Sequence, residues 1–303
     1  MATLIAPMNH SPKEDADVLW KAVKGWGTDE SAIIAIMGQR NAVQRQQIRQ
    51  AYQDIYQEDL IKRLESELSG NFEKAMYRWI LDPADRYAVL ANVAIKSINK
   101  DYHVIVEIAS VLQPQELLAV RHAYHNRYKN SLEEDLLVGL VSSFRYDGVE
   151  INPILAKHEA DILHEAVKNK KGNIEEVIRI LITRSKTQLK ATFNRYRDDH
   201  GFSISKKLLN EASDDFLKAV HVAIRCIDDH KKYYEKVLRG ALKRIGTDED
   251  GLTRVVITRA EKDLKDIKEL YYKRNSVHLE DTVAKEISGD YKKFLLTLLG
   301  KGH

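Results

Sequence analysis

The strongest constraint on this 303-residue chain is an internal repeat, because one pattern of residues returns four times. Each copy contains a tyrosine with an apolar residue or a threonine four positions before it, and the tyrosines are Tyr52, Tyr124, Tyr196 and Tyr271. Successive copies are about 72 to 75 residues apart and together fill nearly the whole chain. A sequence with this period predicts an array of similar units.

Within each copy, the apolar residues have helical spacing. In the first copy they include Val18, Leu19, Ala22 and Val23, and further on Leu60, Leu64 and Leu68. Ser11 followed by Pro12 predicts a helix start, and Thr28-Asp29-Glu30 predicts another, with the hydroxyl as its cap. Proline and glycine are scarce, so we predict an all-α fold with about five short helices in each copy.

The limits of the copies follow from turn signals such as Asp82-Pro83 and Asn152-Pro153. We predict an N-terminal tail at 1–10 and repeats at 11–82, 83–152 (shortened), 153–229 and 230–303. Helical solenoids of the HEAT or armadillo kind also repeat, although at shorter periods of about 40 to 47 residues. The period alone therefore leaves a helical scaffold open.

Composition narrows the classes of partner. Lys and Arg number 48 against 45 Asp and Glu, a balance that does not favour a protein dedicated to nucleic acid. The single cysteine, Cys226, excludes an intramolecular disulfide framework. No secretory signal and no apolar run long enough to span a bilayer are present, so we expect a cytoplasmic protein whose membrane contact is peripheral.

Two copies contain a glycine loop between an apolar helix and a capped helix. The first loop runs from Val23 to Glu30 and the fourth from Leu242 to Glu249. Taken alone, each could be a tight turn with no further role. In both copies, however, a glutamate stands 40 positions after a loop glycine, as the pairs Gly27–Glu67 and Gly246–Glu286 show.

This pairing of loop and acid indicates oxygen coordination. A helix that ends in a glycine loop leaves its last carbonyl groups unpaired, and they carry the negative end of the helix dipole. Three carbonyl oxygens and one bidentate carboxylate suit Ca²⁺, whereas Mg²⁺ keeps its water and Zn²⁺ prefers nitrogen or sulfur. We expect weak binding in solution that tightens when an anionic lipid completes the coordination shell.

Residues at the tips of the two loops are predicted to contact the membrane. Trp26 beside Lys24 suits a lipid headgroup interface, and the alternative is that Trp26 packs back onto its own bundle. Arg244 and Ile245 occupy the matching tip in the fourth copy.

The middle copies lack this design. The second has Ile98-Asn99-Lys100 in place of the glycine loop, and the third has Lys170-Lys171-Gly172-Asn173, although Glu211 still occupies the acid position. We predict that neither middle copy binds calcium in this way.

Several motifs resemble plant annexins across almost the whole chain. They are Lys-Gly-Trp-Gly-Thr-Asp at 24–29, Ser-Leu-Glu-Glu-Asp at 131–135, Leu-Val-Ser-Ser-Phe-Arg-Tyr-Asp-Gly at 140–148, Thr-Arg-Ser-Lys-Thr-Gln-Leu at 183–189 and the run from Gly246 to Gly300. The resemblance implies four five-helix annexin repeats forming a curved disc, with calcium loops facing acidic phospholipid membranes. It also implies the ligands, which are the carbonyls of Val23, Gly25 and Gly27 with Glu67, and those of Leu242, Arg244 and Gly246 with Glu286.

Some residues depart from that family's pattern. Arg244 stands where the family usually has a small turn residue, which predicts strain or weaker binding at the fourth site. Gln39 and Ser110 replace a histidine and a cysteine linked to redox activity in some relatives, and we expect no enzymatic activity. The second repeat is shortened between Asp135 and Leu136.

Other interpretations stay open at this stage. The main alternative is a calcium-independent scaffold, and family analogy adds calcium-linked ion conductance and self-association on membranes. Ile178-Arg179-Ile180 resembles an actin-contact motif, although an ordinary helical segment explains it better. His122 and His125 fit a surface pair better than a zinc site, since no third ligand is near them in the sequence.

Overall fold

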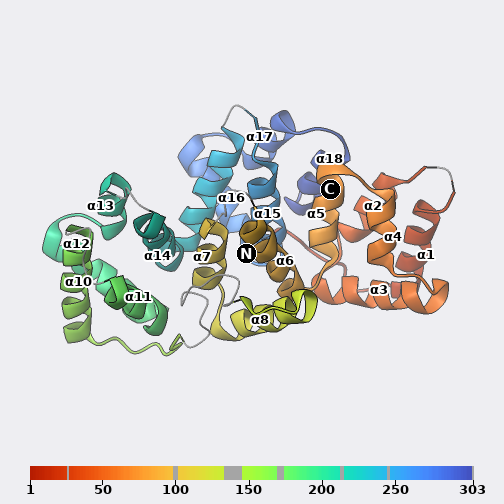
Figure 1. The fold of residues 1–303 in the computed structure, drawn as a ribbon. Coiled ribbons are helices and arrows are strands. Elements are labelled where there is room, and N and C mark those ends of the chain that lie inside the picture. The colour runs from red at the N-terminus through yellow and green to blue at the C-terminus, as the bar shows by residue number, and fades with distance from the viewer. Residues whose placement is uncertain are drawn as a thin grey trace. The chain divides into compact units, whose positions relative to one another are not determined.

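The structure is a computed structural model that describes residues 1–25, 27–97, 102–132, 145–168, 174–211, 215–243 and 246–301. Within these ranges the chain forms 17 helices and no strand, and the prediction of an all-α fold is confirmed (Figure 1). The chain divides into two compact units, Met1–Arg86 with Tyr234–His303, and Tyr87–Tyr233.

The first unit joins the first predicted repeat to the fourth. Its N-terminal helices are α1 (Pro12–Ala22), α2 (Glu30–Met37), α3 (Ala42–Tyr56), α4 (Leu60–Glu67) and α5 (Gly70–Ile80). Its C-terminal helices are α15 (Glu249–Arg259), α16 (Leu264–Asn275), α17 (Leu279–Glu286) and α18 (Gly289–Leu298). Helix α1 packs on α2 and α3, whereas α5 and α2 both pack on α18, so the two repeats share one core.

Buried arginines join the N-terminal and C-terminal parts of the first unit. The Arg86 guanidinium, which is 3% exposed as a residue, donates to the carbonyl oxygens of Arg78, Trp79 and Leu81, and also to that of Ile257 at 2.9 Å. Four satisfied donors explain how this charged group lies in the interior.

Two further arginines also pair with acidic residues from the other end of the chain. Arg45 pairs with Glu261 at 3.0 Å and lies over the Trp79 ring, and burial lowers the pKa of Arg45. Arg78 pairs with Asp250 at 2.8 Å. Residues far apart in the sequence therefore hold the first unit together.

The N-terminal residues also pack on the fourth repeat. The Thr3 hydroxyl donates to the Leu298 carbonyl oxygen at 2.7 Å, and the Thr3 amide donates to that of Ala260 at 3.0 Å. Ser11 then caps α1 as predicted, since its side chain accepts a hydrogen bond from the Glu14 amide at 3.3 Å.

The second unit contains the middle repeats. Its helices are most of α6 (Pro83–Lys96), whose first residues up to Arg86 belong to the first unit, and α7 (Tyr102–Val111), α8 (Pro114–Tyr128), α10 (Pro153–Lys168), α11 (Ile174–Thr183), α12 (Lys186–His200) and α13 (Ile204–Glu211). Helix α14 (Asp215–Leu242) has residues in both units, and a non-helical Asp229 interrupts it. That interruption lies where the sequence places the boundary between 153–229 and 230–303, and the repeat limits stay a prediction.

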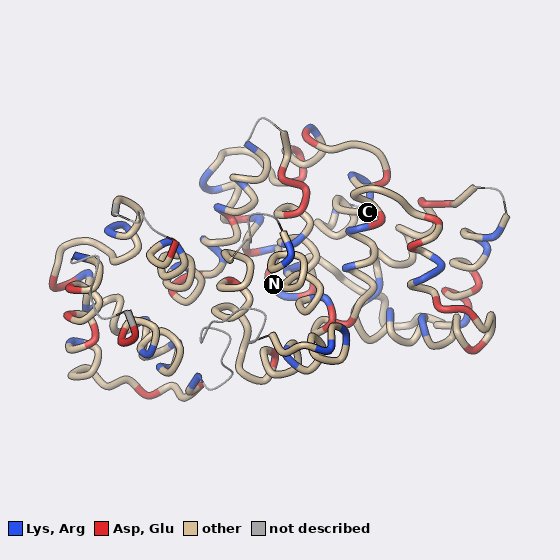
Figure 2. Tube along the Cα trace, viewed as in Figure 1, with Lys and Arg blue, Asp and Glu red and all other residues tan. Residues whose placement is uncertain are grey.

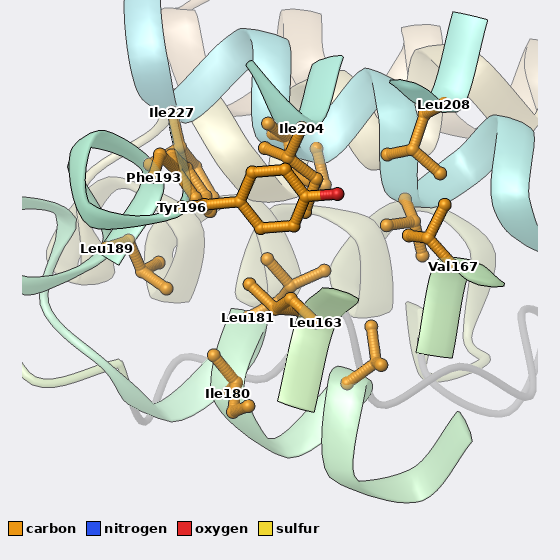
Figure 3. Close-up of a cluster of buried hydrophobic side chains, with 14 of the residues drawn as sticks. Leu163, Val167, Ile180, Leu181, Leu189, Phe193, Tyr196, Ile204, Leu208 and Ile227 are labelled. Atoms are coloured by element: carbon orange, nitrogen blue, oxygen red, sulfur yellow. The ribbon is translucent and has the colours of Figure 1, made fainter. Parts of the chain in front are cut away.

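The core of the third repeat shows why the helical spacing is so regular. Leu163, Ile180, Leu189 and Tyr196 come from α10, α11 and α12, and all four are almost fully buried. Figure 3 shows these side chains pointing toward one another, with Ile204 and Leu208 from α13 beside them. Each helix thus contributes one apolar stripe to a common interior.

Charged side chains of both signs are interspersed along the helices of each unit (Figure 2). This distribution agrees with the near balance of 48 basic and 45 acidic residues. No helix among the described residues is both long enough and apolar enough to cross a bilayer.

Candidate functional site: two helix-end loops

The first loop begins at Val23, the residue that follows α1. Gly25 and Gly27 have φ angles of 108° and 86°, a backbone conformation that side chains with a Cβ atom rarely adopt. A Cβ atom at either glycine would meet nothing within 4 Å, so the conformation, not lack of space, requires glycine here. The Asp29 amide donates to the Ala22 carbonyl oxygen at 2.8 Å and closes the loop.

The fourth loop has the same closure. The Asp248 amide donates to the Ala241 carbonyl oxygen at 3.0 Å, and Gly246 has a φ of 85°. Leu242, the last residue of α14, is buried. Two predicted residues of this loop, Arg244 and Ile245, lie outside the described residues.

The residue that caps the following helix differs from the prediction. In both loops an aspartate is the N-cap, since Asp29 accepts from the Ala32 amide and Asp248 from the Gly251 amide, each at 2.9 Å. The prediction of a hydroxyl cap at Thr28 was wrong. Thr28 lies one position too early to reach the free amides of α2, and its hydroxyl serves another partner.

That partner is the predicted acid. Glu67 is the last residue of α4, and its Oε2 atom accepts a hydrogen bond from the Thr28 hydroxyl at 3.0 Å. The helices between them therefore bring Glu67 back to the glycine loop of the first repeat, 40 positions away in the sequence.

Sequence reasoning missed one residue at this site. Arg63, one turn before Glu67 on α4, donates from Nη2 to the Val23 carbonyl oxygen at 2.6 Å. The same nitrogen lies 3.1 Å from Oε1 of Glu67. One cationic atom thus touches two of the oxygen groups that were assigned to calcium, which shows that both oxygens are directed at a common position. A donor set of this kind fits a hard cation.

The signal for Arg63 was present in the sequence. A basic residue four positions before the acid lies on the same helix face, and the corresponding residue in the fourth repeat is Thr282. When Glu67 and Glu286 are aligned, the sequences of the first and fourth repeats show this difference between Arg63 and Thr282.

The acid of the fourth repeat has different surroundings. Glu286 is the last residue of α17 and is exposed, whereas Glu67 is half-buried. The Thr282 hydroxyl donates to the His278 carbonyl oxygen at 3.1 Å, within its own helix. Among the described residues, the structure gives Glu286 no ion pair.

A tyrosine lies beneath each site. Burial raises the pKa of Tyr52 to about 12, and the charge of Glu58 adds to the shift while that of Arg63 opposes it. Burial likewise raises the pKa of Tyr271, the equivalent residue in the fourth repeat. These phenols are neutral at physiological pH and form part of the core under the loops.

A sequence model of the annexin family matches four stretches of this chain, at residues 14–79, 86–144, 158–223 and 233–298. The chain belongs to the annexin family. It is 66% identical over 312 residues to annexin-like protein RJ4 of Fragaria ananassa, with 99% of each chain covered. This match to an annexin of a plant confirms the plant-type resemblance.

Solved annexin structures agree with the fold. Annexin III superposes with a TM-score of 0.92 at 31% identity, covering 99% of this chain and 97% of that one. Calcium-bound annexin (Sm)1 superposes with a TM-score of 0.85 at 28% identity, covering 99% and 93%. The four annexin repeats predicted from the sequence are therefore confirmed.

The annexin residues predicted to face the membrane are only partly placed. The Lys24 ammonium lies 4.0 Å from the centroid of the Trp20 ring, which in turn stacks on Tyr56. Trp26 lies outside the described residues. So do 98–100 and 170–173, the segments on which the prediction of two inactive middle repeats depends.

Other candidates find no new role in this annexin. In the segment that resembles an actin-contact motif, Ile180 is buried in the core of the third repeat and Arg179 pairs with Glu176. Cys226 is buried. The described residues contain no group of three or more His, Cys, Asp or Glu side chains that could hold a metal ion. The predicted calcium sites are not of this kind, because each consists of backbone carbonyl groups and a single acidic side chain.

Proposed function

We propose that this annexin binds acidic phospholipid membranes in a calcium-dependent manner, through the loops of its first and fourth repeats. The ligands in the first repeat are the carbonyl oxygens of Val23, Gly25 and Gly27 with the carboxylate of Glu67. In the fourth repeat they are the carbonyl oxygens of Leu242, Arg244 and Gly246 with the carboxylate of Glu286.

One observation carries the proposal. The Val23 carbonyl oxygen and the Glu67 carboxylate, which come from different helices, both contact the Nη2 atom of Arg63, at 2.6 and 3.1 Å. Two oxygen groups that converge on one positive atom form part of a cation site. The positive φ angles of Gly25 and Gly27 support the same interpretation, since they reverse the chain beside that position.

The chemistry of such a site explains why lipid is required. Three carbonyl oxygens and a bidentate carboxylate supply five ligands, whereas Ca²⁺ takes six to eight. Water or a phosphate oxygen of a lipid completes the shell. A single carboxylate leaves a net positive charge at the bound ion, and an anionic membrane neutralises it.

Family membership gives further support, because calcium-bound annexin (Sm)1 is among the structures that this chain resembles. Calcium is the cofactor in this proposal. Lys24, Trp26, Arg244 and Ile245, at the loop tips, are the membrane contacts. The protein then moves from the cytoplasm to the membrane surface when calcium rises.

The proposal is tested by sedimentation with vesicles of phosphatidylserine and phosphatidylcholine across a calcium titration. We expect binding that saturates with calcium, reverses with chelator and disappears on pure phosphatidylcholine. Binding to phosphatidylserine that chelator leaves unchanged would support the calcium-independent scaffold and overturn the proposal.

A further inference from the structure

Arg63 occupies the position to which the oxygen groups of the first site are directed. Its Nη2 atom is within 3.1 Å of both the Val23 carbonyl oxygen and the Glu67 carboxylate, and its side chain is 31% exposed. A calcium ion bound by the same two oxygens would lie about 2.3 to 2.6 Å from each, in the space that this nitrogen fills. The guanidinium and the metal therefore exclude each other.

An ordinary ion pair on a helix surface does not account for this placement. A basic residue four positions before an acid is the weaker orientation of such a pair, because it runs against the helix dipole. Arg63 also donates to a carbonyl group at the end of α1, 40 positions earlier in the chain. It thus connects the two halves of the site.

We propose that Arg63 is an internal competitor for calcium, a built-in cation that holds the first site closed until the metal displaces it. This inference rests on the proposed function of the loop. In the closed state both oxygens of Glu67 are in use, since Oε2 accepts from Thr28 and Oε1 pairs with Arg63. Calcium must release Oε1 before the carboxylate can bind it in a bidentate manner.

The fourth repeat provides the comparison. Thr282 stands where the first repeat has Arg63, and its hydroxyl donates to the carbonyl oxygen of His278, the residue before α17. Glu286 is exposed and has no ion pair among the described residues. Among the described residues, the fourth acid thus has no cationic partner to lose when it meets calcium, and Arg63 makes the first site the one that needs more calcium.

Exchanging the two residues tests this assignment. Arg63→Thr is made together with Glu286→Gln, so that binding reports on the first site alone, and Glu286→Gln by itself is the control. Thr282→Arg is made together with Glu67→Gln, with Glu67→Gln by itself as the control. Calcium midpoints are measured by sedimentation with phosphatidylserine vesicles, and thermal unfolding is recorded without calcium.

We expect Arg63→Thr to lower the calcium midpoint of the first site about tenfold, which is the combined effect of removing its ion pair with Glu67 and its hydrogen bond to the Val23 carbonyl oxygen. Thr282→Arg should raise the midpoint of the fourth site by a similar factor. Arg63→Lys, made together with Glu286→Gln, keeps the charge. Its calcium midpoint should stay close to that of Glu286→Gln alone, since an ammonium group can still reach Glu67.

Other outcomes overturn the proposal. An unchanged midpoint for Arg63→Thr, with only a lower unfolding temperature, would mean that Arg63 merely supports the fold. A raised midpoint would mean that it helps to order Glu67 for the metal. If Arg63→Thr fails to fold, Thr282→Arg decides, and an unchanged midpoint there is equally adverse. Failure of the unmodified protein to bind vesicles with calcium would instead remove the proposed function itself.

Discussion

The loops of the first and fourth repeats have the same backbone closure but different surroundings. In each, an aspartate amide closes the loop on the carbonyl group of Ala22 or Ala241, and the same aspartate caps the next helix. Their acids differ, since Glu67 is half-buried and paired with Arg63, whereas Glu286 is exposed.

This difference teaches that loop shape and affinity have separate causes. Glycine and the capping aspartate set the shape, and in our proposal the partner of the acid sets how readily calcium enters. A ranking of the two sites from their loops alone, which favours the first because Arg244 interrupts the fourth, omits the second cause.

The largest effect is expected from removing both acids. Glu67→Gln with Glu286→Gln keeps the size of both side chains but removes the only carboxylate of each site. Calcium-dependent binding to phosphatidylserine vesicles should fall at least about a hundredfold, because each ion loses its only charged ligand. The circular dichroism spectrum should not change. Substantial binding by the double variant would place the calcium sites elsewhere.

Alanine at the loop glycines should affect the two repeats equally. Gly27 and Gly246 have φ angles of 86° and 85°, and a Cβ atom in that conformation costs about 1–2 kcal/mol. Gly27→Ala and Gly246→Ala should therefore lower the free energy of unfolding by similar amounts in denaturant titrations. Gly240→Ala, within a helix of ordinary φ, is the control and should not destabilise. A large inequality between the two loop variants would break the claim of a shared backbone.

The capping aspartates provide a smaller test of the same equality. Asp29→Ala and Asp248→Ala each remove one side-chain cap at 2.9 Å, and each should cost about 1 kcal/mol in the same titrations. Asparagine at either position should restore most of the loss, because its side-chain oxygen also caps a helix. A loss at only one position would show that the two helix starts differ.

The smallest effect distinguishes the two threonines. Thr28→Val removes the hydroxyl that donates to the Glu67 carboxylate, and the first site should need about two- to fivefold more calcium, since one partly exposed hydrogen bond contributes modestly in net free energy. Thr247 makes no such bond among the described residues, so Thr247→Val should leave the fourth site unchanged. Equal effects would mean that both acids are oriented in the same way.

Much of the fold could be predicted from the sequence, because the information is local. The spacing of apolar residues within each repeat and the cap at Ser11 indicate helices without reference to distant parts of the chain. The union of the first and fourth repeats could not be predicted this way. It depends on Arg45, Arg78 and Arg86 reaching residues more than 170 positions away, which no periodicity encodes.

For the candidate site too, the sequence predicted one part and not another. Recurrence of the glycine loop and the acid at one separation predicted that Glu67 returns to its loop, and Thr28 contacts it there. The role of Thr28 was assigned wrongly because a hydroxyl before an acidic turn resembles a helix cap. The spacing of Arg63 and Glu67 indicates their shared helix face, but it does not reveal the contact of Arg63 with the Val23 carbonyl group, which is a backbone atom 40 positions away.

The most direct test of the central claim is a crystal structure of this annexin soaked with calcium. The account predicts metal ions in the first and fourth loops, each bound by carbonyl oxygens of its loop and by both carboxylate oxygens of Glu67 or Glu286. Calcium bound only in the middle repeats, or at neither loop in a crystal that leaves both accessible, would contradict it.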